Sequence, residues 1–525
     1  MNTLNSTHNT GTKTSSRIES VKLVFNGIFP ALIVISISVM TSNLIAASGS
    51  DSTKHWVGTW ACAPYPMGSN NSNFPPTIAN NTARQVVRVS IGGDTVRVKF
   101  SNKTSNSATT MKAVNIAVSP DGTKSPVTES TITSLTFNGN ASVTMQAKET
   151  VTSDPVAFDL QPSARTAITI YYGSAGNSSD MTGHVASRTD SYVASGDQST
   201  KATFTGPVQT TAHWFHISAM EVLADTFTYA VACLGNSITD GYPLSGGLQN
   251  RWPDMFSEKL LRDPATAKVG VLNLGIGATN ITGSGETTGM SRYKLDVLGQ
   301  SGVRWFIILY GVNDIAAGTS ANAITNTYKT MITDGHANNM KVYGVTLTPF
   351  MTYNDTKYTT RESVRTDVNK WIRTPGNFDE IIDFEKVIQD PSKPTELWLK
   401  YSTDGLHPNA DGYKLLGESI DSTLFMIPTA TRRDERKNSS ALSETINLLT
   451  VNGKASVTFA IPHDAFVSLK VYSLSGKEIA ELAGKNFSAG KYTLAIKIQY
   501  LTRGTYIYSM KTGELSVSGK MVLSR

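Results

Sequence analysis

The sequence predicts an α/β protein in which a central parallel-sheet domain lies between two β-rich regions. Within residues 226–427, apolar runs of strand length alternate with amphipathic stretches, which is the pattern of repeated βαβ units. Residues 52–225 are rich in Thr, Ser, Val and Asn and alternate with period two, without a convincing helix. Short alternating strands return at 443–525, so a chain of 525 residues is expected to form three folded parts.

The N-terminus has the composition of an export signal. Basic residues precede an apolar core at 28–40, and small residues follow at 46–48. A membrane anchor is the alternative, but this apolar core is shorter than the ~20 residues that a bilayer-spanning helix needs. We therefore expect residues 1–48 to be a cleaved signal peptide, with no stable membrane span after processing.

The region at 52–225 is expected to be an antiparallel β-sandwich or a jelly-roll-like accessory domain. Its strongest local signal is the pair of alternating runs 86–91 and 95–100, which are joined by two glycines and an aspartate and predict a β-hairpin. Further strands are expected at 111–119, 130–138, 141–147 and 164–172.

The central domain at 226–427 should contain buried parallel strands, which appear in a sequence as continuous apolar runs. The expected strands are 229–234, 269–274, 303–310, 341–347 and 380–384. The expected helices are Trp252–Leu261, Ala321–His336, Thr360–Ile372 and Ala410–Leu424.

The end of the chain is expected to be a linker followed by a small β-sandwich. Residues 428–442 are polar and charged, which is typical of a linker. Within 443–525, strands are expected at 455–461, 466–473, 490–498, 504–512 and 516–523.

The charge distribution does not favour a nucleic-acid partner. The net charge is +6, but residues 49–427 carry 30 Lys and Arg against 33 Asp and Glu. The positive excess therefore lies at the two ends of the chain and forms no basic patch on the main body.

Cysteine and histidine usage implies no metal and no organic cofactor. Cys62 and Cys233 match no metal or redox spacing; a single disulfide between them and two separate buried thiols are both open. His213 and His216 fit the two faces of a strand as well as they fit a metal site.

Four polar segments follow strand-like runs in the central domain. In a parallel sheet the carboxyl ends of the strands share one edge, so these segments can converge in one crevice. They are Gly235–Gly241, Asn273–Asn280, Gly311–Asp314 and Asp404–His407.

Together these segments contain the groups that a serine hydrolase needs. Ser237 is the candidate nucleophile, His407 the general base that later protonates the leaving alcohol, and Asp404 the carboxylate that orients the histidine. The Asn313 amide and the backbone N–H groups of Ser237 and Ala278 are candidate oxyanion donors. Taken alone, Asn313 could cap a helix and His407 could be an ordinary surface histidine.

The order and spacing of these segments resemble the four sequence blocks of the GDSL, or SGNH, hydrolases. The resemblance covers 226–427 and implies a flavodoxin-like three-layer fold, with Ser237, Asp404 and His407 as the catalytic triad and Asn313 as an oxyanion donor. Two departures stand out. Asn236 replaces the usual aspartate, and Ala278 stands where the family usually has a glycine.

The C-terminal region resembles the type A sorting domain of type IX secretion systems. The matching segments are Val471–Lys477, Gly504–Tyr506 and Lys520–Leu523. The resemblance implies a partner in the secretion machinery, whereas a carbohydrate-binding or spacer module is the alternative.

These resemblances lead us to expect a secreted or cell-surface serine esterase that hydrolyses short acyl esters. An acetyl group on a plant polysaccharide such as xylan or pectin is the favoured substrate. A lysophospholipase or broad arylesterase of the same fold is the alternative, and a non-catalytic glycan-binding surface protein is an alternative of another class.

Overall fold

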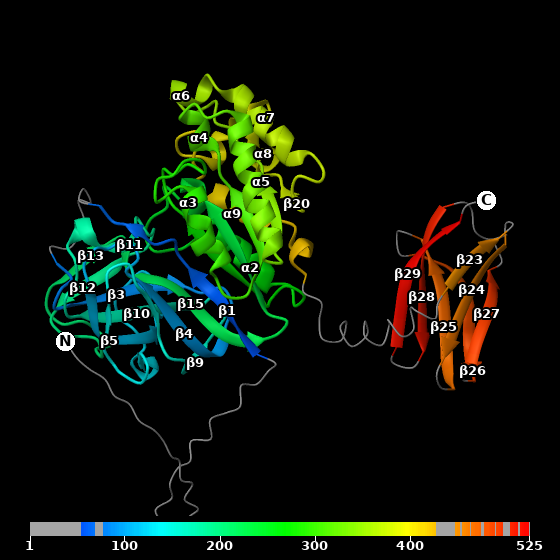
Figure 1. Ribbon diagram of the computed structural model, residues 1–525, viewed down its shortest axis with the longest axis horizontal. Coiled ribbons are helices and arrows are strands. Elements are labelled where there is room, and N and C mark those ends of the chain that lie inside the picture. The colour runs from blue at the N-terminus through cyan, green and yellow to red at the C-terminus, as the bar shows by residue number, and fades with distance from the viewer. Residues whose placement is uncertain are drawn as a thin grey trace, which may run out of the picture. The chain divides into compact units, whose positions relative to one another are not determined.

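A computed structural model describes residues 54–68, 77–426 and, with gaps, 447–523. The expected signal peptide at 1–48 and the expected linker at 428–442 lie outside the described residues. Strands dominate the first and last parts of the described chain, and the longer helices belong to the part between them (Figure 1). Within the described ranges, no helix is long and apolar enough to cross a membrane.

The region from Lys54 to Asp225 is β-rich and is built from three antiparallel sheets. The first contains β1 (Lys54–Ala61), β15 (Ile217–Asp225), β4 (Gly93–Ser101) and β8 (Thr150–Thr152), with β9 (Val156–Leu160) also on β4. The second contains β13 (Val208–Thr211), β12 (Ser191–Ser195), β3 (Asn81–Arg88), β10 (Arg165–Tyr172), β5 (Thr109–Val118) and β6 (Thr133–Leu135), with β7 (Val143–Met145) also on β5. The third contains β14 (His213–Phe215), β11 (Thr182–Val185) and β2 (Tyr65–Pro66).

The hairpin predicted from 86–91 and 95–100 is wrong. Both strands form, but β3 pairs with β10 and β12, whereas β4 pairs with β15, β8 and β9 in another sheet. The chain crosses between the sheets because Ser90 bonds to the Thr59 carbonyl oxygen through both its N–H, at 2.8 Å, and its hydroxyl, at 2.6 Å. The predicted turn therefore connects two strands that do not pair with each other.

The strand predicted at 130–138 is shorter than expected. Glu129–Thr131 form a 3₁₀ turn, η1, and only Thr133–Leu135 are extended. The Thr131 hydroxyl donates to the Thr128 carbonyl oxygen at 2.7 Å, a local bond that competes with strand pairing. A second 3₁₀ turn, η2, covers Ser178–Asp180.

The next part of the chain contains a five-stranded parallel sheet in the order β17-β16-β18-β19-β20. Its strands are β16 (Tyr229–Gly235), β17 (Val269–Gly275), β18 (Val303–Leu309), β19 (Lys341–Val345) and β20 (Glu380–Ile382). All five match the predicted apolar runs to within two residues. The strand order reverses between β16 and β18, and the carboxyl ends at such a reversal are where open α/β sheets bind ligands.

Helices connect these strands. They are α1 (Ser237–Asp240), α2 (Trp252–Leu261), α3 (Gly289–Tyr293), η3 (Lys294–Leu298), α4 (Val312–Ala316), α5 (Ala321–Ala337), α6 (Thr356–Thr359), α7 (Glu362–Arg373), α8 (Phe384–Ile388), η4 (Leu399–Tyr401), α9 (Ala410–Ser419) and η5 (Ser422–Phe425). The last predicted helix is too long. It ends at Ser419, because Asp421 caps the separate turn η5 by accepting a bond from the Thr423 N–H. A short antiparallel pair, β21 (Gln389–Asp390) and β22 (Lys393–Leu397), precedes η4.

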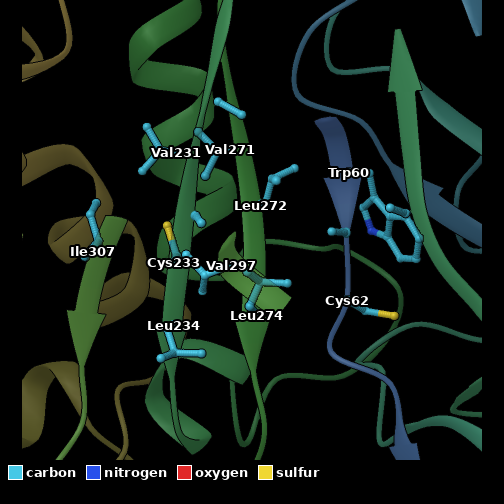
Figure 2. Packing of buried hydrophobic residues seen from close by; sticks show 14 of the residues in the cluster. Trp60, Cys62, Val231, Cys233, Leu234, Val271, Leu272, Leu274, Val297 and Ile307 are labelled. Atoms are coloured by element: carbon cyan, nitrogen blue, oxygen red, sulfur yellow. The ribbon is translucent and has the colours of Figure 1, made fainter. Parts of the chain in front are cut away.

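The β-rich region and the parallel sheet share one hydrophobic core. β17 is an edge strand of the parallel sheet, and its Val271 N–H donates to the Ser90 hydroxyl at 2.9 Å. Leu272 lies on the side of β17 that faces Trp60 (Figure 2). A Cβ added at Gly58 would lie 2.9 Å from a Leu272 methyl carbon. The β-rich region therefore covers an edge strand that would otherwise expose unpaired backbone groups.

The two cysteines are separate buried thiols. Cys62 follows β1 and its thiol bonds to the Ile217 carbonyl oxygen, whereas Cys233 lies within β16 (Figure 2). Of the two possibilities that the sequence left open, the disulfide is excluded. Burial raises the pKa of both thiols, so neither is a reactive thiolate.

The C-terminal part contains two antiparallel sheets. One has the order β23-β24-β27 and the other β26-β25-β28-β29. Their strands are β23 (Asn447–Val451), β24 (Lys454–Ile461), β25 (Ala465–Tyr472), β26 (Glu478–Phe487), β27 (Gly490–Ile496), β28 (Gly504–Thr512) and β29 (Leu515–Leu523). Along β25, the buried residues Val467, Leu469 and Val471 alternate with more exposed ones, as predicted for a strand with one buried face.

Candidate active site

Ser237 lies at a tight turn between β16 and α1. Asn236 caps α1, since its side-chain oxygen accepts a hydrogen bond from the Ile238 N–H at 3.1 Å. An amide oxygen performs this capping as well as a carboxylate, so the Asn at 236 keeps the turn intact. Gly241 ends the helix with a φ of 98°, a conformation that favours glycine.

The structure brings the Ser237, His407 and Asp404 side chains into one hydrogen-bonded chain. Ser237 Oγ lies 3.0 Å from His407 Nε2, and His407 Nδ1 lies 2.7 Å from Asp404 Oδ2. The other carboxylate oxygen accepts the backbone N–H groups of His407, at 2.7 Å, and Leu406, at 2.9 Å. Asp404 and His407 are three residues apart, and these backbone bonds let a short loop hold both.

Asp404 is ionised at neutral pH. Burial alone would raise the pKa of its carboxyl group, but hydrogen bonds from the His407 ring and from the backbone of His407 and Leu406 outweigh burial and lower it below 3.8. A carboxylate in this position can fix the tautomer of the imidazole and stabilise its protonated form.

The three candidate oxyanion donors lie at the same edge of the sheet. Neither the Ser237 nor the Ala278 N–H donates a hydrogen bond to another described residue. Ala278 has a φ of 58°, in the left-handed region that favours glycine. Alanine adopts this conformation here at the cost of some strain.

The Asn313 amide is held from two sides. Its Nδ2 donates to the Thr279 carbonyl oxygen at 2.9 Å, and its Oδ1 accepts the Tyr358 hydroxyl at 3.2 Å. Burial is the main cause that raises the pKa of Tyr358 to about 12, so the phenol stays protonated and can donate. Asn313 lies within the first turn of α4 and its side chain does not cap that helix.

An open cleft of about 360 Å³ exposes these groups. Besides the five predicted residues, its lining contains Arg188, Tyr242, Gly277, Tyr353, Tyr358 and Leu406. The Tyr242 ring packs edge-on against the His407 imidazole, with 4.7 Å between ring centroids. Aromatic rings and a single arginine therefore surround the serine.

A second His–Asp pair lies under this cleft and was not predicted. His184 Nε2 is 2.9 Å from Asp240 Oδ1, and Arg188 Nη2 donates to Asp240 Oδ2 at 2.6 Å. Burial would raise the pKa of Asp240, but the bond from His184 and the charges of His184 and Arg188 lower it. Asp240 belongs to the predicted serine segment, whereas His184 and Arg188 come from the β-rich region and no local motif marks them.

A buried arginine supports the strand ends beneath the serine. Arg292 donates to the Gly235 carbonyl oxygen at 3.0 Å, to the Tyr310 hydroxyl at 2.8 Å and to Asp296 at 2.7 Å. The Tyr310 hydroxyl in turn lies 2.8 Å from the Thr279 hydroxyl, next to Asn313. The ends of β16 and β18 are thereby tied together.

His213 and His216 lie in the core. His216 is fully buried between the Thr109 and Tyr172 hydroxyls, each at 3.3 Å, and burial lowers its pKa to about 3. His213 accepts the Ala186 N–H at 3.1 Å. Among the residues that the structure describes, no group of three or more His, Cys, Asp or Glu is placed to hold a metal ion.

Solved structures similar to this chain include three hydrolase-type proteins. A protein assigned to the G-D-S-L lipolytic family from Desulfitobacterium hafniense is 21% identical, with 37% of this chain and 97% of that chain covered and a TM-score of 0.30. A GDSL-like lipase from Bacteroides thetaiotaomicron is 18% identical, with 36% and 83% covered and a TM-score of 0.28. A catalytic mutant of an acetylxylan esterase from Geobacillus stearothermophilus is 17% identical, with 36% and 91% covered and a TM-score of 0.30.

No curated protein matches this chain. Two family models do match it: the GDSL-like lipase/acylhydrolase family over residues 233–415, and the secretion system C-terminal sorting domain over residues 450–524. The first range contains all the predicted site residues. Residues 233–415 therefore belong to the GDSL-like lipase/acylhydrolase family, and residues 450–524 form a sorting domain of the type IX secretion system.

Proposed function

We propose that this protein is an exported serine esterase that removes short acyl groups, foremost acetyl, from plant polysaccharide. The family of residues 233–415 implies an ester hydrolase, and the sorting domain indicates export to the cell surface or the medium through the type IX machinery. The observation that carries the mechanism is the Ser237–His407–Asp404 chain, with its distances of 3.0 and 2.7 Å.

In the proposed mechanism Ser237 Oγ attacks the ester carbonyl carbon while His407 Nε2 accepts its proton. Asp404 stabilises the imidazolium that forms and is not itself protonated. The tetrahedral intermediate collapses when the imidazolium protonates the leaving alcohol, which leaves an acyl-serine. Water then attacks the acyl-serine, and His407 again acts as base and then as acid.

We propose Ser237 N–H, Ala278 N–H and the second Asn313 amide hydrogen as the oxyanion hole. The two backbone groups have no other acceptor among the described residues, and the Asn313 amide is oriented by Thr279 and Tyr358. Donors that are already oriented need no reorganisation during the reaction, and losing one typically costs about 10²–10³-fold in rate.

The substrate class rests on export and on the character of the cleft. Tyr242, Tyr353 and Tyr358 supply aromatic faces and hydroxyls, which suit a sugar ring better than a long acyl chain. A lysophospholipase or broad arylesterase is the alternative with the same chemistry. A surface glycan-binding protein without activity is the alternative of another class.

We also propose an architecture for the three folded parts of the chain. The strand order β17-β16-β18-β19-β20 supports a flavodoxin-like three-layer domain at 226–427. The paired sheets support a sandwich-like accessory domain at 52–225 and a small C-terminal sandwich at 443–525.

The substitution Ser237→Ala tests the serine mechanism. Hydrolysis of 4-nitrophenyl acetate should fall by at least about 10⁴-fold, because Ser237 supplies the hydroxyl that lies 3.0 Å from His407 Nε2. Ser320→Ala, which removes a hydroxyl from the cap of α5, is the matched control and should keep its activity. Ester hydrolysis retained by Ser237→Ala would exclude the serine mechanism.

A substrate panel separates the alternatives. Acetate release from acetylated xylan and pectin supports the polysaccharide esterase, and fatty-acid release from lysophospholipid supports the lipase alternative. Resistance of the wild type to a serine-directed phosphonate, together with tight glycan binding, would identify a binding protein instead.

A further inference from the structure

Arg188 brings a positive charge from the β-rich region into the cleft. It lies between β11 and β12, and its guanidinium carbon is 5.3 Å from the centroid of the Tyr242 ring. A Cβ added at Gly277, beside the oxyanion donor Ala278, would be 4.0 Å from Arg188 Nη2. Arg188 is therefore next to both the oxyanion loop and the aromatic wall.

The guanidinium has donors to spare. Among the described residues its hydrogen-bond partner is Asp240, bound through Nη2 at 2.6 Å. Nη1 has no such partner, and Nε is buried without one. Arg188 also has a φ of 60°, in the left-handed region that costs an ordinary side chain energy.

Arg188 reaches from the buried Asp240 carboxylate into the cleft. Asp240 also bonds to His184, at 2.9 Å, from within the core. The Arg188 side chain lines the cleft and is 13% exposed, whereas the Asp240 side chain is 2% exposed. Asp404, the carboxylate in the cleft lining, is bonded to His407, and Arg188 is the permanently charged cation of that lining.

The position of Arg188 points to the alcohol side of the ester. The leaving alcohol must lie near His407 Nε2 to receive its proton. The Tyr242 ring packs against His407, and the Arg188 guanidinium carbon lies 5.3 Å from the centroid of the same ring. An alcohol held beside His407 is therefore also beside Tyr242 and within reach of the guanidinium.

We propose that Arg188 binds a carboxylate on the alcohol part of the substrate, so that the preferred ester is an acylated saccharide containing uronic acid. This inference rests on the proposed esterase function and narrows its polysaccharide substrate to an acidic one. An arginine–carboxylate contact is a charge-assisted hydrogen bond, and its loss is expected to reduce kcat/KM by about 10- to 100-fold.

The test is a selectivity ratio measured on the full chain. We compare kcat/KM for acetylated galacturonate oligomers with kcat/KM for acetylated xylose oligomers. The acidic substrate should be favoured, the preference should weaken with added salt, and Arg188→Gln should reduce the ratio by about 10- to 100-fold. Arg188→Lys, which keeps the charge but not the planar fork, should give an intermediate ratio.

Arg304→Gln is the matched control. Arg304 also stacks over an aromatic ring, 4.8 Å from the Tyr229 centroid, but it does not line the cleft. The ratio should be unchanged in this variant. An equal fall in both variants, or no fall in Arg188→Gln, would overturn the proposal.

Two further measurements need only the wild type. Galacturonate should inhibit 4-nitrophenyl acetate hydrolysis competitively and at least about tenfold more strongly than galactose does; equal inhibition would overturn the proposal even if Arg188→Gln failed to fold. A preference for mono-4-nitrophenyl succinate over 4-nitrophenyl acetate would place the carboxylate on the acyl side and overturn the assignment to the alcohol. Loss of the proposed function would instead appear as ester hydrolysis surviving in Ser237→Ala.

Discussion

Two His–Asp pairs flank the short serine helix α1, and their geometry is nearly the same. His407 Nδ1 is 2.7 Å from Asp404, and His184 Nε2 is 2.9 Å from Asp240. Hydrogen bonds and nearby charge outweigh burial for both carboxylates and lower both pKa values. Neither the distance nor the direction of the pKa shift separates a pair built for catalysis from a structural one.

The surroundings of the second ring nitrogen do separate them. His407 Nε2 faces the Ser237 hydroxyl, whereas His184 Nδ1 bonds to the Ala63 carbonyl oxygen at 2.9 Å. The Asp404 side chain is 32% exposed and the Asp240 side chain 2%. One imidazole can exchange a proton with a reacting group, and the other is held between two acceptors. Solvent access and a transferable proton therefore distinguish the proposed catalytic pair from the buried one.

Replacing Asp404 with Asn should give the largest effect on catalysis. The amide cannot stabilise the imidazolium and favours the wrong tautomer, so we expect kcat for 4-nitrophenyl acetate to fall by about 10⁴-fold. The unfolding temperature should change little, because this side chain is partly exposed. Steady-state kinetics and thermal unfolding check both parts. A kcat within tenfold of the wild type would contradict the assignment of Asp404.

The same change at Asp240 should give the opposite result. Asp240→Asn leaves Arg188 beside a buried amide, and breaking a buried ion pair in this way typically costs about 3–5 kcal/mol of unfolding free energy. The loss in kcat should be far smaller than for Asp404→Asn. Denaturant unfolding measures the stability. A large fall in kcat with little change in unfolding free energy would show that the two pairs do not divide the roles as proposed.

The buried Asp240 pair should also make the unfolding free energy depend on pH. The folded-state pKa of Asp240 lies below its ordinary value near 3.8, so the ionised form stabilises the folded protein at neutral pH. This stabilisation is complete above the unfolded-state pKa and is lost as the pH falls through the lower folded-state pKa. Wild-type unfolding free energy should therefore fall below about pH 4, and the fall should be smaller in Asp240→Asn.

The central sheet was predictable because its strands are continuous apolar runs that end in polar segments. The strand Tyr229–Gly235 and the serine that follows it are local in sequence, and strand ends of a parallel sheet must meet. The β3–β4 hairpin failed because pairing of β4 with β15 depends on residues more than a hundred positions away. The β-rich region shares a hydrophobic core with the sheet, a contact that no local pattern in the sequence predicted.

Site residues that come from distant parts of the chain could not be predicted from the sequence for the same reason. His184 and Arg188 lie some fifty positions before Asp240, and no spacing links them to it. Tyr358 reaches Asn313 only because the chain folds back between β19 and α7. A local motif identifies groups that react, whereas the groups that position them depend on the tertiary fold.

Tyr358→Phe extends the comparison to the oxyanion side. The change removes one hydroxyl and leaves the ring, so the Asn313 amide loses its 3.2 Å partner but keeps the Thr279 bond. We expect kcat to fall by about tenfold with KM nearly unchanged, because the loss is felt in the transition state. Tyr353→Phe, on the neighbouring ring, is the control. A rise in KM with kcat unchanged would show that Tyr358 contacts substrate and does not orient Asn313.

Ala278→Gly should have the smallest effect and the opposite sign for stability. Ala278 has a φ of 58° and lies in the same domain as Ser237. Arg188 has a φ of 60° and lies in the β-rich region. Glycine relieves the strain of the left-handed conformation and keeps the N–H, so we expect about 1 kcal/mol of added stability and activity within a factor of three. Ala323→Gly, on the exposed face of α5, should instead destabilise by about 1 kcal/mol. If Ala278→Gly lost both stability and activity, the Ala278 methyl group would be what holds the loop of the proposed oxyanion donor in place.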